Sequence, residues 1–317
     1  MMMFDQARLT GQITCLINPR ASNSQWVRKR KLRNYLQAKL PGDIHDVFGD
    51  VRTTVERARE LSQDTAILVA VGGDGTIADA LQGLHEAGRL GSIVLGIIPF
   101  GSGNAFRKAF GIPLNPRRAI ECLASGVVRR IDLVELEGRC FGFASVGATA
   151  AATEEKFLRK VAGMWGHRKV ARRLLSYPRE PKTVELFDGV DDRGERFERR
   201  VIESRFFDCV VATTNYWGYS WFMSPRARLD DGYLDVTLYE MTSGQYFRAF
   251  PLIFFGRYQK RLPHFKARRV IITGRGLPVQ YHGEYLGARD RVEFRVLPQA
   301  LSVICPATAR GRRFFVR

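Results

Sequence analysis

The sequence has no arrangement of cysteines that would build a disulfide framework or a zinc site. Its five cysteines are odd in number and scattered over 317 residues, and no two have C-x-x-C spacing. Unpaired cysteines of this kind are typical of reduced thiols in a cytosol. The cysteines therefore predict a cytoplasmic protein.

Long apolar segments are also absent. No apolar run approaches the ~20 residues that are needed to span a bilayer. The first residues, M-M-M-F-D-Q-A-R-L-T-G, lack the apolar centre of a signal peptide. We therefore expect a protein that meets a membrane only from its surface.

Acidic residues are scarce relative to basic ones. There are 32 Asp and Glu against 50 Lys and Arg, and the formal net charge is +18. Such a surface is attracted to anionic membranes or nucleic acid, and each basic residue near an anionic bilayer contributes ~1 kcal/mol. The alternative is that the charge serves only solubility. The 45 % hydrophobic content is ordinary for a globular protein, and the length suggests two domains.

Two glycine loops stand where familiar phosphate signatures are missing. There is no G-x-x-x-x-G-K-[ST], and Gly101-Ser102-Gly103 lacks the third glycine of a dinucleotide fingerprint. Instead, an apolar strand from Ala66 breaks at Gly72-Gly73-Asp74-Gly75, and a helical pattern starts at Thr76. Glycines and the free amides of a helix's first turn suit a phosphate. The alternative is a tight turn in which Asp74 only caps the helix.

The second loop strengthens the prediction of an anion site. A strand over 93–98 ends at Pro99, and Gly101-Ser102-Gly103-Asn104 precedes a short helical pattern. Two strand ends with glycine loops suit a ligand crevice at the carboxyl edge of a parallel sheet. A carboxylate such as Asp74 would repel phosphate there unless a cation lies between them or a hydroxyl gives it a proton.

The order of the expected elements predicts two domains. Strands and helices alternate over 1–130, which indicates an α/β domain with a doubly wound parallel sheet. Short strands over 131–299 predict a mainly antiparallel β-sandwich, and residues 300–317 are expected to pack back onto the first domain. A basic and apolar helical insertion over 153–177 has two interpretations, a membrane-facing element or a helix packed on the sandwich.

These motifs resemble the diacylglycerol kinase catalytic family, which includes bacterial lipid kinases and sphingosine and ceramide kinases. The resemblance is carried by G-G-D-G-T at 72–76, P-F-G-S-G-N-A-F at 99–106, Asn18-Pro19 and P-R-A-R-L-D-D-G-Y-L-D-V at 225–236. It covers roughly residues 13–287. It implies a lipid kinase that uses ATP and Mg²⁺ to phosphorylate a hydroxyl of a diacylglycerol-like or sphingoid-like acceptor, in a cleft between the domains.

The resemblance also assigns site residues. Those expected to bind the nucleotide are Asn18, Gly72, Gly73, Asp74, Gly75, Thr76, Gly101, Ser102, Gly103 and Asn104. Asp231 would hold a structural Mg²⁺ with the carbonyl groups of Arg228 and Tyr233, since carboxylates and carbonyls suit that ion. On spacing alone, the same residues read as an ordinary Asp-Gly hairpin turn.

Two departures from the family pattern bear on catalysis. His282 stands where the family has the Asp of D-G-E, the general base. A neutral imidazole suits that task near pH 7, but nearby nucleotide charge would raise its pKa. Three interpretations remain open: His282 is the base, Asp74 or Glu284 is the base, or activity is lost. In addition, Thr149 is the only polar residue where relatives place an Asp against the lipid head group.

Rival functions are a non-catalytic nucleotide- or lipid-binding family member and an NAD kinase. The latter shares G-G-D-G, but its later N-x-G-x-L-G-F segment has no match here. Nucleic-acid binding is not expected, because no recognised module is present. The expected partners are ATP, a lipid acceptor and an anionic membrane surface, with a homodimer left open. The expected location is cytoplasmic and peripherally membrane-associated.

Overall fold

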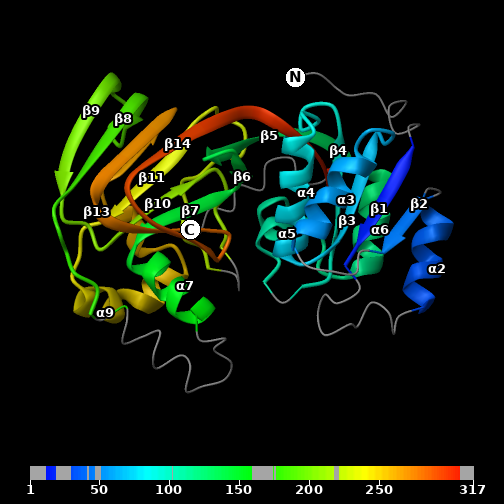
Figure 1. Ribbon diagram of the computed structural model, residues 1–317, viewed down its shortest axis with the longest axis horizontal. Coiled ribbons are helices and arrows are strands. Elements are labelled where there is room, and N and C mark those ends of the chain that lie inside the picture. The colour runs from blue at the N-terminus through cyan, green and yellow to red at the C-terminus, as the bar shows by residue number, and fades with distance from the viewer. Residues whose placement is uncertain are drawn as a thin grey trace. The chain divides into compact units, whose positions relative to one another are not determined.

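The structure is a computed structural model that describes residues 12–18, 30–40, 43–46, 51–101, 103–158, 174, 176–217 and 221–307. The chain divides into two compact units. The first combines the residues up to Ile131 with those from Gln299 onward, and the second runs from Asp132 to Pro298. Figure 1 shows the first unit as mixed helices and strands and the second as mainly strands.

The first unit contains a parallel sheet. Its strands lie in the order β2-β1-β3-β4-β14, and each neighbouring pair is parallel. Every residue of β3 is buried, as expected for a strand covered on both faces. The strands are β1 (Ile13–Ile17), β2 (Asp43–Asp46), β3 (Ile67–Gly72), β4 (Val94–Pro99) and the end of β14 (Glu284–Cys305).

Five helices accompany this sheet in the part of the chain that the structure describes. They are α2 (Arg30–Lys39), α3 (Val51–Leu61), α4 (Asp74–Glu86), α5 (Ala105–Ala109) and α6 (Pro116–Ser125). Leu36 of α2 and Ile120 of α6 pack with Ile17 and Val69 in one buried cluster. Helices α3 and α4 pack against each other.

The second unit is an antiparallel, sandwich-like domain. Its strands follow the order β14-β13-β7-β10-β11-β12-β8-β9. The first half of β13 also pairs with β8, and its second half pairs with β7, so the ladder returns on itself around a buried apolar core. The strands are β5 (Val127–Leu136), β6 (Arg139–Phe141), β7 (Phe143–Gly147), β8 (Lys182–Asp191), β9 (Arg196–Ser204), β10 (Asp208–Ala212), β11 (Leu234–Tyr239), β12 (His264–Ala267) and β13 (Arg269–Tyr281).

Helices also belong to this unit. Helix α7 (Ala148–Leu158) follows β7, and α9 (Ser243–Phe254) covers a second apolar cluster. Most of the predicted insertion, 159–173 and 175, lies outside the described residues, as does the segment 308–317. All five cysteines are buried free thiols. No helix in the described ranges is both long and apolar enough to cross a bilayer.

Candidate functional site

The two glycine loops of the first unit touch each other. Strand β3 ends at Gly72, and the N–H of Phe100, just after β4, donates a 2.7 Å hydrogen bond to the Gly72 carbonyl. A Cβ atom on Gly101 would lie 2.4 Å from the Cα of Gly73. Only glycine allows this approach. The structure thus brings the two predicted loops together at the carboxyl ends of neighbouring parallel strands.

Gly75 has a different environment from these glycines. It is exposed, its φ is not left-handed, and a Cβ atom there would meet nothing within 4 Å. Glycine inside a helix costs up to about 1 kcal/mol relative to alanine. The fold therefore has no packing reason for glycine at this position. A ligand lying against the first turn of α4, where backbone amides have no intrahelical acceptor, would provide one.

Asp74 links the two loops. Its Oδ1 accepts a 3.3 Å hydrogen bond from the Phe106 N–H, and the backbone amides of Ala105 and Asn104 face the same carboxylate. Burial raises the pKa of Asp74, and these amides oppose the rise. The α4 N-cap, Gly73, makes no side-chain cap. Asp74 therefore caps the following helix, α5, and not its own.

Two asparagines complete the loop geometry. The Asn18 Nδ2 donates a 3.3 Å hydrogen bond to the Oγ1 of buried Thr76. Asn104 has a left-handed φ of 50°, and its side chain accepts from the Gly101 N–H at 3.1 Å and donates to the Gly101 carbonyl at 2.5 Å. Gly103 belongs to the same turn, and Ser102 lies outside the described residues.

His282 occupies the hairpin turn between β13 and β14. His282 and Gly283 have φ values of 47° and 83°, the left-handed pair of a type I′ turn. The His282 Nε2 accepts a 3.1 Å hydrogen bond from the Gly142 N–H, and the ring lies edge-on to Phe143 with 4.8 Å between centroids. Burial lowers the pKa of His282 to about 3. The imidazole is thus neutral, and its Nε2 lone pair is used by a backbone amide.

Glu284 follows this turn with an exposed side chain. Its Oε2 accepts a 3.2 Å hydrogen bond from the Tyr281 hydroxyl. That hydroxyl accepts one of 2.9 Å from Arg139, so three elements hold the carboxylate in position. Of the three candidate bases, His282 and Asp74 serve backbone amides, whereas Glu284 keeps an exposed carboxylate.

A buried polar chain behind the same turn was not predicted from the sequence. The Gly283 N–H donates to Gln280 Oε1 at 2.9 Å, and Gln280 Nε2 donates to Ser145 Oγ at 3.0 Å. Ser145 Oγ lies 2.7 Å from Thr149 Oγ1, which donates to Asp208 Oδ2 at 2.5 Å. Burial raises the pKa of Asp208 to about 8. The sequence signal that could have indicated this chain is Asp208, a charged residue at the start of the apolar strand D-C-V-V-A.

The predicted magnesium loop contains a cation of its own. The Lys266 Nζ contacts Asp231 Oδ2 and lies 3.7 Å from Asp235 Oδ2. Asp231 Oδ1 accepts from the Tyr233 N–H at 3.3 Å. Among the described residues, no cluster of three or more His, Cys, Asp or Glu could hold a metal. Lys266 therefore occupies the carboxylate that is predicted to hold a structural Mg²⁺ with the Arg228 and Tyr233 carbonyls, and the Mg²⁺ site stays a prediction.

Lys266→Met is expected to make this loop respond to Mg²⁺. The substitution leaves the partly buried Asp231 carboxylate without its cation and leaves buried Asp235 with His264 alone. The lost partner costs roughly 1–3 kcal/mol, which an added divalent ion can offset. In nucleotide-free thermal unfolding, we expect no Mg²⁺ effect on wild type and partial recovery of the Tm in Lys266→Met. Lys260→Met, at an exposed position, is the matched control. A Mg²⁺-dependent Tm in wild type that disappears in Asp231→Asn would show that Mg²⁺, and not Lys266, balances the Asp231 carboxylate.

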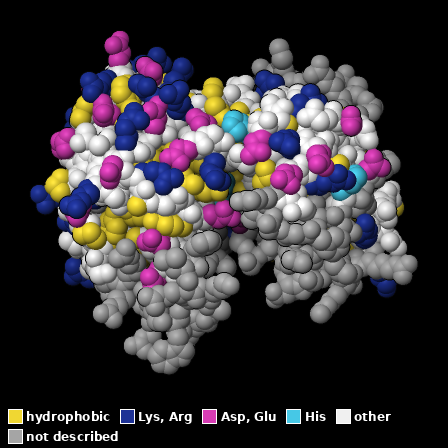
Figure 2. All heavy atoms as spheres, in the orientation of Figure 1, with side chains coloured by type: hydrophobic (Ala, Val, Ile, Leu, Met, Phe, Trp, Pro, Cys, Tyr) yellow, Lys and Arg dark blue, Asp and Glu magenta, His cyan; other side chains and the backbone are white. Residues whose placement is uncertain are grey.

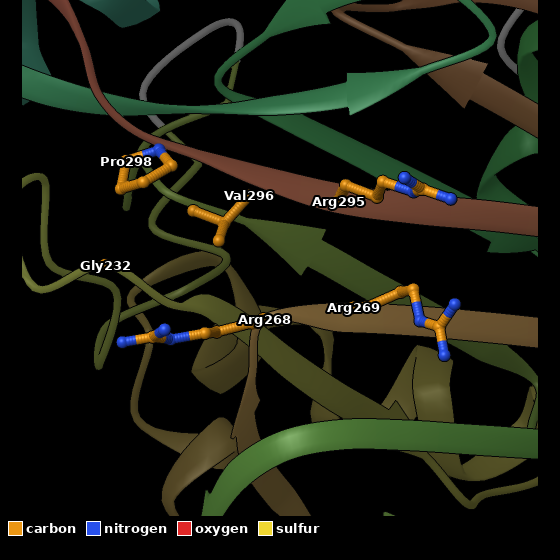
Figure 3. A pocket seen from close by; sticks show the side chains of 6 residues that line it. All are labelled: Gly232, Arg268, Arg269, Arg295, Val296 and Pro298. Carbon is orange, nitrogen blue, oxygen red and sulfur yellow. The ribbon is translucent and has the colours of Figure 1, made fainter.

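A cavity of about 300 Å³ lies beside this loop, lined by Gly232, Arg268, Arg269, Arg295, Val296 and Pro298. In Figure 3, Arg268 extends toward Gly232, whereas Arg269 and Arg295 extend the other way. Arg269 and Arg295 pair with Glu293 at 3.9 Å and 2.8 Å. Arg268 lies over the Tyr233 ring, 5.7 Å from its centroid. The three guanidinium groups are thus directed to different partners.

Comparison with known proteins matches this arrangement along most of the chain. Residues 12–136 match the diacylglycerol kinase catalytic domain, and residues 171–305 match the YegS C-terminal NAD kinase beta sandwich-like domain. A probable lipid kinase YegS-like protein from Pseudomonas aeruginosa is 32 % identical over 82 % of each chain. A diacylglycerol kinase from Mycobacterium tuberculosis is 27 % identical over 93 % of this chain and 96 % of that one.

Solved structures show the same fold. A crystal structure of a diacylglycerol kinase from Bacillus anthracis superposes with a TM-score of 0.71 at 19 % identity, over 94 % of this chain and 98 % of that chain. The chain belongs to the diacylglycerol kinase catalytic family of lipid kinases. Within it, the C-terminal domain is of the YegS type.

Proposed function

We propose that the protein transfers the γ-phosphate of ATP to a hydroxyl of a lipid acceptor, diacylglycerol-like or sphingoid-like. The observation that carries this proposal is Gly75, whose missing side chain serves no internal contact at the open first turn of α4. It lies beside the touching pair Gly73 and Gly101. Backbone amides there suit the oxygens of a nucleotide phosphate. Family membership supports the kinase reaction.

The residues have simple tasks in this proposal. Phosphoryl transfer depends mainly on positioning and on electrostatic stabilisation. The glycine loops, with Asn18, Thr76 and Asn104, hold the nucleotide, and Asp74 keeps the loops together. Mg²⁺ bound with the nucleotide would neutralise phosphate charge. Glu284 accepts the proton of the acceptor hydroxyl, with His282 shaping the turn that carries it.

The proposal extends to the architecture of the two domains and to the location of the protein in the cell. We infer a doubly wound first domain, 1–130, in which α2 and α6 cover one face of the sheet and α3 and α4 the other. The second domain, 131–299, would bind the acceptor. The protein would work in the cytoplasm, peripherally on an anionic membrane, because the net charge of +18 favours that surface.

A second candidate is a family member that binds nucleotide or lipid without turnover. The specific observation in its favour is His282, which stands at the position of the family's catalytic Asp and is used by the Gly142 amide. This candidate predicts ATP binding without product. It predicts the same loop geometry, so only turnover separates the two.

The test is transfer of labelled phosphate from γ-labelled ATP and Mg²⁺ into organic-extractable product. The acceptors are diacylglycerol, monoacylglycerol, sphingoid bases and ceramide in mixed micelles, and Asp74→Ala, which loses the acceptor that links the loops, is the inactive control. A labelled lipid that the control does not make supports the kinase and identifies the acceptor class. If no product forms with any acceptor while ATP binding is intact, the second candidate, a non-catalytic binding protein, replaces the kinase proposal.

A further inference from the structure

The segment 241–283 has an extreme charge balance. It contains no Asp or Glu and eight Lys or Arg residues. The segment begins with α9, whose inner face buries Tyr246, Ala249 and Ile253 in the core of the second unit. A surface helix with one apolar face would be polar on its other side. Helix α9 is not.

The outer face of α9 is apolar toward its end. Leu252 is 41 % exposed and Phe255 is 61 % exposed, the largest exposed fraction among the large hydrophobic side chains of the described residues. They follow exposed Arg248 at i+4 and i+7, so the three lie on one face. Pro251, also exposed, belongs to the same face.

The tip of α9 is held firmly by aromatic packing. Phe254 lies 5.1 Å from Phe255 and 5.8 Å from Trp221, measured between ring centroids. Gly256 ends the helix with a φ of 70°, and a Cβ atom there would lie 2.3 Å from the Phe222 ring. These contacts fix the end of the helix, so Phe255 is held in place with its side chain exposed to solvent. Exposed Arg257 follows directly.

Cations surround this apolar tip. Lys260 and Arg261 continue the exposed basic side chains after Arg257. On the face seen in Figure 2, hydrophobic side chains gather in a band across the unit that contains α9, with Lys and Arg side chains, and some Asp and Glu, beside them. Apolar and aromatic groups flanked by Lys and Arg match the boundary between acyl chains and anionic head groups. A second copy of the chain would instead bring like charges together.

We propose that the tip of α9, formed by Arg248, Leu252, Phe255 and Arg257, docks on an anionic lipid bilayer. The proposal deepens the proposed function by assigning the surface that meets the acceptor's membrane. It predicts two contributions, apolar insertion by Leu252 and Phe255 and attraction by the arginines. The second falls with added salt, because exposed charges are screened.

The test is co-sedimentation with vesicles of phosphatidylglycerol and phosphatidylcholine, compared with phosphatidylcholine alone. The double variant Leu252→Ser and Phe255→Ser should bind anionic vesicles roughly tenfold more weakly. The double variant Arg248→Gln and Arg257→Gln should lose part of the preference for anionic vesicles and part of the salt dependence. Leu114→Ser, at a 59 % exposed site on the first unit, is the matched control and should bind like wild type.

A spectroscopic variant tests insertion directly. Phe255→Trp should show a blue-shifted emission when anionic vesicles are added, since the indole leaves water. Unchanged binding by the serine variant, no shift in Phe255→Trp, or a dimer in light scattering that the serine variant abolishes would each overturn the proposal. None of these readouts needs turnover, so failure of docking and failure of the kinase assay are distinguishable.

Discussion

Gly75→Ala is expected to lower ATP affinity and kcat/KM while leaving the protein folded. The new Cβ atom meets nothing within 4 Å inside the protein, and alanine is the better helix former by up to about 1 kcal/mol. The methyl group projects where the nucleotide phosphates are proposed to lie. A displacement of about 1 Å in a reacting group can cost roughly 100-fold in rate. Calorimetric ATP titration and thermal unfolding measure the two effects separately.

Gly101→Ala provides the matched comparison. Its Cβ atom would lie 2.4 Å from the Gly73 Cα, so the loops must separate and the Tm must fall along with ATP binding. The two alanine variants therefore differ in stability although both weaken ATP binding. If Gly75→Ala bound ATP with wild-type affinity, the nucleotide would not lie against the first turn of α4. That conclusion would hold whatever the result for Gly101→Ala.

The glycine loops could be predicted because short stretches of sequence specify them. A strand followed by G-G-D-G and a helical pattern indicates a turn and a helix start without knowledge of distant residues. The contact between Gly73 and Gly101 was not predictable in the same way, since it requires two strands to lie side by side. The cap by Asp74 on α5 depends on that neighbourhood as well, whereas the alternative interpretation of the sequence was a cap on its own helix.

Other elements were missed because their signals conflict with short-range rules. Residues 269–281 form one strand, β13, although Gly274, Gly276 and Pro278 suggest a break. The register shift between Thr273 and Leu277 accommodates these residues. Helix α9 contains Pro251, which masks its periodicity, but its Thr242 and Gln245 form a capping box that marks its start.

In the second unit, residues that are distant in sequence contact the predicted site residues. The family pattern predicts a metal at Asp231, and the pairing of β12 with β11 brings Lys266, which is distant in sequence, to the same carboxylate. His282 likewise matches the position of a base, whereas its burial and its bond to Gly142 are properties of the folded hairpin. Position in a motif predicts location, and the local contacts decide the chemistry.

Glu284→Gln is expected to reduce kcat by roughly 10²–10⁴-fold, the usual contribution of a general base, with little change in KM for ATP. His282→Asn should reduce kcat far less. Asparagine tolerates the left-handed φ of 47° and offers an oxygen to the Gly142 N–H. Steady-state kinetics with the acceptor identified in the lipid panel measure both. The reverse order, with His282→Asn inactive and Glu284→Gln active, would make His282 the base.

The pH dependence of stability tests, without any turnover, whether His282 is a general base or only shapes the hairpin turn. Burial lowers the pKa of His282 from its ordinary value of 6.5 to about 3. Between these values the unfolded chain binds a proton that the folded protein refuses, so wild type loses stability as pH falls below 6.5. His282→Asn has no such group, and its Tm relative to wild type should rise as pH falls from 6.5 toward 4. A constant difference in Tm would mean that the imidazole is accessible to protons and able to serve as a base.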